Sequence, residues 1–146
     1  TANFYMDLMD PSPKMLEFMK RMHDFYSRLM EKWAKTDVDA LNMMDDWGSQ
    51  KDLLIDLGLD AVNSQLFCMG LENLEQFRGK ITFWGEIDRQ HLLPEGTPAD
   101  IDRAVEAVYK TLWKDGGCIA QCEFGPGAKP ENVYQVFKAW ENIRNR

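Results

Sequence analysis

A glycine pair, a β-prone run and a proline follow one another near the end of the chain and predict a helix, a strand and a second helix. Gly116–Gly117 ends the first helix, because glycine readily adopts the left-handed conformation found at helix ends. The strand is predicted over Cys118–Phe124. The next helix is predicted to begin at Pro130, because the first turn of a helix does not need the N–H that proline lacks. In a parallel α/β protein, Cys122 and Glu123 would then stand at the carboxyl end of a strand, where such folds carry their chemistry.

The same alternation extends over most of the chain. Apolar residues at helical spacing after Ser12 and Pro13 predict an amphipathic helix up to Trp33, with an apolar stripe packed on a sheet. A crossover helix with a capping box is predicted from Thr97 to Trp113. Three further strands are predicted over 38–46, 61–67 and 80–87. Strands alternating with helices imply parallel βαβ units, hence an α/β fold.

Length and composition exclude several classes of protein. The 146 residues, 45% of them hydrophobic, suit one globular domain, so 1–146 is predicted to be a single domain. A net charge of -7 makes nucleic acid and anionic membrane poor partners. No run of 18 apolar residues marks a membrane span, and three cysteines fit no disulfide scaffold, which favours a reducing cytoplasm.

Several polar side chains fall at the predicted carboxyl ends of strands. Parallel strands bring these ends to one rim, where four carboxylates would converge: Asp45, Asp46, Asp88 and Glu123. As catalytic groups they would transfer protons or support a metal from its second shell; alternatively, some cap the helices that follow. His91 lies in a rim loop and either contacts substrate or is solvated.

Short motifs, in order along the chain, resemble those of the uroporphyrinogen decarboxylase superfamily, which includes corrinoid- and zinc-dependent methyltransferases. The matching segments are Asn3–Met6, Asp45–Gln50, Gly85–Asp88 with Gly96–Pro98, and Pro130–Val133. The resemblance covers nearly the whole chain and corresponds to the carboxyl-terminal half of a member. It implies a (β/α)8 barrel of which this chain supplies about four strands, with Gln50, Gly85 and His91 expected to bind substrate.

One junction departs from the family pattern. The predicted helix from Lys51 to Leu57 is too short to return the chain along a parallel strand. Family members carry an extra helix and strand between the segments that match Gln50 and Lys51, so the resemblance implies a missing segment there. In the methyltransferases that strand bears a His-x-Cys pair that binds zinc, and this sequence contains no such pair.

Three interpretations of the function remain open, two of them catalytic. Nine residues before Glu131, the decarboxylases carry a histidine and the methyltransferases carry a cysteine that is the third zinc ligand; here the residue is Cys122. This favours zinc-dependent methyl transfer from a methyl-corrinoid to a thiol, with Cys122 as metal ligand and a corrinoid protein as partner. The alternative for Cys122 is a buried thiol used in packing.

The second activity is cofactor-free decarboxylation of uroporphyrinogen, a tetrapyrrole of porphyrin biosynthesis. The third is no catalysis at all, in a half-barrel that associates with itself. Because four βα units cannot close a barrel, the open strand edges predict a homodimer.

Overall fold

The computed structural model describes residues 2–42 and 55–146 of the chain. These residues belong to two compact units, Thr1–Met44 and Asp45–Arg146, which are described separately below. The second unit contains a parallel sheet, most of the helices and the candidate site.

Residues 2–42 of the first unit form two helices, α1 (Ala2–Met9) and α2 (Pro13–Trp33). The predicted start of α2 is confirmed: the Ser12 hydroxyl accepts a hydrogen bond from the Met15 N–H at 3.2 Å, and Pro13 lies in the first turn. No residue of α2 is buried, and the packing of its apolar stripe on a sheet stays a prediction.

The strand predicted over 38–46 is wrong for its described part. Residues 38–42 form bends and irregular backbone, and the remainder lies outside the described residues. A strand is stable only with a partner to hydrogen-bond, and an apolar run in the sequence does not guarantee one.

In the described part of the second unit, residues 55–146, there are three parallel strands: β1 (Ala61–Ser64), β2 (Thr82–Glu86) and β3 (Cys118–Gln121). They lie in the order β1-β2-β3. The register pairs Ser64 with Gly85 and Glu86 with Gln121, so the three strands end at the same edge. The predicted parallel α/β architecture is confirmed at this level: the chain is mixed α/β with a small parallel sheet.

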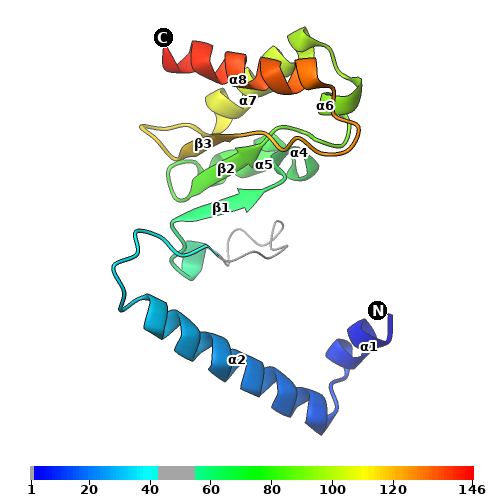
Figure 1. Ribbon diagram of the computed structural model, residues 1–146, viewed down its shortest axis with the longest axis vertical. Coiled ribbons are helices and arrows are strands. Elements are labelled where there is room, and N and C mark those ends of the chain that lie inside the picture. The colour runs from blue at the N-terminus through cyan, green and yellow to red at the C-terminus, as the bar shows by residue number, and fades with distance from the viewer. Residues whose placement is uncertain (1, 43–54) are drawn as a thin grey trace. The chain divides into compact units, whose positions relative to one another are not determined.

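Helices fill the connections of this unit. They are α4 (Leu66–Met69), α5 (Leu71–Leu74), the 3-10 turn η1 (Glu75–Phe77), α6 (Leu92–Glu95), α7 (Pro98–Leu112) and α8 (Pro130–Arg144). The crossover helix α7 begins with the predicted capping box between Thr97 and Asp100. Figure 1 shows α7 and α8 lying side by side, and they contact each other extensively.

The two faces of the sheet differ. The alternating residues Ile81, Phe83, Gly85 and Ile87, which share one face of β2 and its flanks, are all buried. On the opposite face Trp84 is 38% exposed and Ile119 of β3 is 42% exposed, which leaves this face open in the described structure. Parallel sheets are usually covered on both faces. The homodimer predicted from the sequence would cover such a face and stays a prediction.

Two strands end earlier than predicted. After Ser64 the chain turns into α4, whose Leu66 is fully buried, so the apolar run 61–67 is part strand and part helix. β3 ends at Gln121 because its partner β2 ends at Glu86. Cys122 and Glu123 therefore follow the strand directly, as expected from the sequence. In the ranges that the structure describes, no helix combines the length and apolarity needed to cross a membrane.

Candidate functional site

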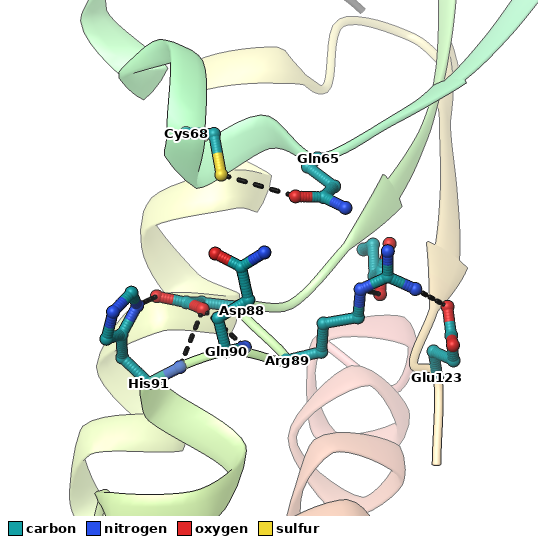
Figure 2. A network of polar contacts seen from close by, with 8 residues as sticks. Gln65, Cys68, Asp88, Arg89, Gln90, His91 and Glu123 are labelled. Atoms are coloured by element: carbon teal, nitrogen blue, oxygen red, sulfur yellow. Dashed lines mark hydrogen bonds and ion pairs between the residues drawn. The ribbon is translucent and has the colours of Figure 1, made fainter. Parts of the chain in front are cut away.

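Polar side chains follow each of the three strands at the edge where their carboxyl ends meet. Gln65 and Cys68 follow β1, residues 86–91 end and follow β2, and Glu123 follows β3. Figure 2 shows three neighbouring pairs among these groups: Cys68 with Gln65, His91 with Asp88, and Arg89 with Glu123. We call them the strand-end rim, defined by Gln65, Cys68, Glu86, Asp88, Arg89, Gln90, His91 and Glu123.

Arg89 joins two carboxylates of the rim. Its Nη1 donates to Oε2 of Glu123 on the neighbouring segment (Figure 2). Its Nε lies 3.4 Å from Oε1 of Glu86. The three side chains form a carboxylate–arginine cluster in which one guanidinium faces two carboxyl groups, and Arg89 and Glu123 remain partly exposed while Glu86 is buried.

Glu86 has the most perturbed environment of these acids. Its side chain is 7% exposed, and burial raises the pKa of Glu86 from the ordinary 4.5, because desolvation disfavours the charged form. Arg89 opposes this rise, whereas Glu123 and Asp88 add to it. Oε1 of Glu86 accepts no hydrogen bond from the described residues, and neither does Oε1 of its strand neighbour Gln121.

Asp88 is engaged in the turn after β2. Its Oδ1 accepts the backbone N–H groups of Gln90 at 2.9 Å and His91 at 3.0 Å, and its Oδ2 lies 3.4 Å from Nδ1 of His91. Side chains that accept backbone donors two and three residues ahead fix such turns. Asp88 therefore stabilises the turn before α6, whose own N-cap residue is His91, and His91 stands exposed in the rim loop.

A small pocket lies between the loops that follow β1 and β2. Its volume is about 10 Å³, room for about one water-sized group. Among its lining residues are Gln65, Cys68, Glu86 and Arg89, and the Cys68 thiol donates to Oε1 of Gln65 at 3.3 Å. Glu86 is thus among the residues that line a narrow pocket at the rim, while its Oε1 is buried.

Cys122 lies beside the rim but packs against the hydrophobic core. Burial raises the pKa of its thiol to about 11, and the charges of Glu86 and Glu123 contribute to this rise. Zinc is bound by Cys, His, Asp or Glu side chains that are held together at bonding distance. No three candidate ligands gather in this way among the described residues, and the sequence lacks the His-x-Cys pair. The residues present do not fit a zinc site of the methyltransferase type.

The remaining predicted site residues fall into two groups. Asp45, Asp46 and Gln50 lie outside the described residues. Gly85 lies on the helix-covered face of β2, where a Cβ would come within 2.5 Å of Cδ1 of Leu66. Its position is thus explained by close packing, and contact with a substrate at Gly85 stays a prediction.

Sequence reasoning missed Glu86 and Arg89 as members of the site. Glu86 shares a face of β2 with the exposed Trp84, yet its own side chain is buried. The signal was a carboxylate in the last position of a strand whose other residues carry no charge, followed three residues later by an arginine. Only the parallel register of β2 and β3 brings Glu123 to the same arginine.

Together these features define a class of protein: a parallel α/β unit with a buried acid and an ion-pair cluster at the carboxyl ends of its strands. No protein-family model, no curated protein and no solved structure matches the chain.

Proposed function

We propose that this chain forms part of a (β/α)8-type enzyme that acts on a tetrapyrrole, with uroporphyrinogen decarboxylation as the reaction. The fold supports the barrel: helices cover one face of the parallel strands, and the other face, with Trp84 and Ile119, is open as the interior of a partial barrel would be. The single observation that carries the proposal is Glu86, a buried acid with a raised pKa at the carboxyl end of a strand.

The reaction requires three proton transfers, two additions and one loss, and no cofactor. A proton adds to a pyrrole carbon, the bond to the carboxylate of the acetate arm breaks, and CO2 leaves while its electron pair neutralises the ring. A second proton converts the resulting exocyclic methylene to a methyl group, and the ring carbon loses the first proton. The net change replaces CO2 with one proton.

The carboxylate–arginine cluster contains groups suited to these steps. Glu86, whose pKa is raised, can donate a proton near neutral pH more readily than an ordinary carboxylate. The ionised carboxyl of Glu123 can stabilise the positive charge of the protonated pyrrole, and Arg89 holds both acids in place.

Methyl transfer to a thiol remains the competing proposal and has less support. It needs a zinc-bound thiolate, whereas the Cys122 thiol packs against the core and its pKa is raised to about 11. The poor fit of the residues present to zinc therefore places methyl transfer second.

The test uses the purified full chain with uroporphyrinogen under anaerobic, reducing conditions, and chromatography of the oxidised products. We expect porphyrins with seven to four carboxyl groups. Glu86→Gln should lower the rate by about 10²-fold or more, the usual contribution of a general acid. Glu141→Gln, which changes an exposed acid of α8, is the matched control and should keep the rate.

The pH dependence provides a second check. Because Glu86 must be protonated to act, the rate should fall as pH rises through its raised pKa. Product formation no greater than in a protein-free control would refute the proposal. Bound zinc in chelator-free protein, together with methyl transfer from methylcobalamin to a thiol, would favour the competing activity.

A further inference from the structure

Asn132 stands apart from the residues discussed so far because it is a fully buried polar side chain in the first turn of α8. Its Nδ2 donates two hydrogen bonds, to the carbonyl of Leu93 at 3.0 Å and to the carbonyl of Gly96 at 2.9 Å. Both acceptors belong to α6 and its end, more than thirty residues earlier in the chain. One amide therefore joins two segments that the sequence keeps far apart.

The α6 segment and the start of α8 are each connected to one partner of the Arg89–Glu123 ion pair. The N–H of Leu93 donates to the carbonyl of Asp88 at 3.0 Å, and Asp88 precedes Arg89. On the other side, Lys129 caps α8 and ends the loop that begins after β3 with Glu123, and its N–H donates to the carbonyl of Leu93 at 3.1 Å. The backbones that carry Arg89 and Glu123 thus converge on Leu93.

The geometry points to Asn132 as a positioning residue, which fixes the loops of Arg89 and Glu123 relative to each other and so assembles the carboxylate–arginine cluster. That this position of the cluster serves catalysis rests on the proposed function, whereas the positioning of the two loops by Asn132 rests on the structure alone. Asn132 contacts neither Glu86 nor the two ion-pair partners through any described hydrogen bond, and it acts through the backbone.

The unsatisfied oxygen of Asn132 supports this inference. Its Oδ1 is buried and accepts no hydrogen bond from the described residues. A buried acceptor without a donor opposes folding, so an amide is a costly choice if burial alone is required. What the amide supplies, and an apolar side chain cannot, is a pair of donors directed at two carbonyls.

The test measures the cluster itself and needs no enzyme activity. In the ¹⁵N-labelled full chain, the Nε–H signal of Arg89 is assigned by its loss in Arg89→Lys. In Asn132→Ala we expect this signal to move to the position of a solvent-exposed arginine. The matched control is Gln135→Ala, which also removes a bond from α8, the 2.7 Å hydrogen bond from Gln135 to Asp102 of α7, and should leave the signal unchanged.

Three outcomes would overturn the inference. The first is an unchanged Arg89 signal in folded Asn132→Ala, and the second is an equal shift of that signal in Asn132→Ala and Gln135→Ala. The third is that neither Asn132→Ala nor the milder Asn132→Ser folds while Gln135→Ala does. The last result would assign Asn132 to folding alone. Decarboxylase activity is measured in parallel. If the wild type has no decarboxylase activity but the Arg89 signal still shifts in Asn132→Ala, the positioning role of Asn132 is upheld. Only the proposed function is then refuted.

Discussion

The substitution Gly85→Ala tests whether this glycine is required by packing. A Cβ at this position would lie 2.5 Å from Cδ1 of Leu66 and 3.7 Å from Cγ1 of Val108. Carbon atoms in contact are normally about 3.5 to 4.0 Å apart, so Leu66 would have to move by about 1 Å. Leu66 is fully buried and has little room to move. We expect overpacking to lower the free energy of unfolding by about 2 kcal/mol.

A second substitution shows whether the clash is with Leu66. Leu66→Val alone removes one buried methylene and should cost about 1 kcal/mol. If the two changes were independent, the double variant would lose about 3 kcal/mol. Because the shorter side chain makes room for the new methyl group, we expect a loss of only about 1 kcal/mol, a strong departure from additivity. The assay is urea unfolding followed by circular dichroism.

The control is Gly125→Ala. The nearest atom to a Cβ there, Oε1 of Glu123, is 3.8 Å away, an ordinary contact, so stability should change by no more than about 0.5 kcal/mol. The packing argument is wrong if Gly85→Ala is as harmless as Gly125→Ala, or if the double variant is additive. Either result would return weight to a direct role of Gly85 in binding substrate.

Two further predictions concern protonation. In the unfolded chain Glu86 has its ordinary pKa of 4.5, whereas in the folded protein its pKa is raised, so the wild type should lose stability as pH rises between these two pKa values. Glu86→Gln should lack this loss of stability. Equal urea-unfolding profiles of the two proteins from pH 4 to pH 8 would contradict this prediction. For Cys122, the rise of its pKa from 9.0 to about 11 makes the thiolate about a hundredfold rarer at pH 8 than in the unfolded chain. Iodoacetamide should label it correspondingly more slowly in the folded protein, as followed by peptide mass spectrometry; equal rates would show that the thiol is not buried.

Local signals predicted the parts of the fold that local interactions determine. The start of α7 follows from Thr97 and Asp100, which satisfy each other's backbone donors and need nothing else in the chain. Alternation along β2 identifies the residues that share a face, such as Phe83 and Gly85, and both are buried. Such features are encoded within a few residues and can be recognised without knowing the topology.

The site was harder to predict because its members meet through pairing across the sheet. Glu86 is buried although Trp84 on the same face of the strand is exposed, and its partner Arg89 also contacts Glu123, 34 residues away. The strand predicted over 38–46 failed in its described part for a related reason: a strand depends on a neighbour that the local sequence does not reveal. Convergence of polar groups at the strand ends was predictable, whereas the particular ion pairs were not.

The position of β2 between two parallel neighbours has a consequence for how this protein can change during evolution. Side chains alternate along a strand, so inserting or deleting one residue within Thr82–Glu86 would exchange the faces of the residues beyond that point and break their pairing with β1 and β3. Length variation in the turn around Gly127 disturbs no strand pairing among the described residues. We therefore expect descendants of this chain to differ in loop length while the residue count of the central strand stays fixed.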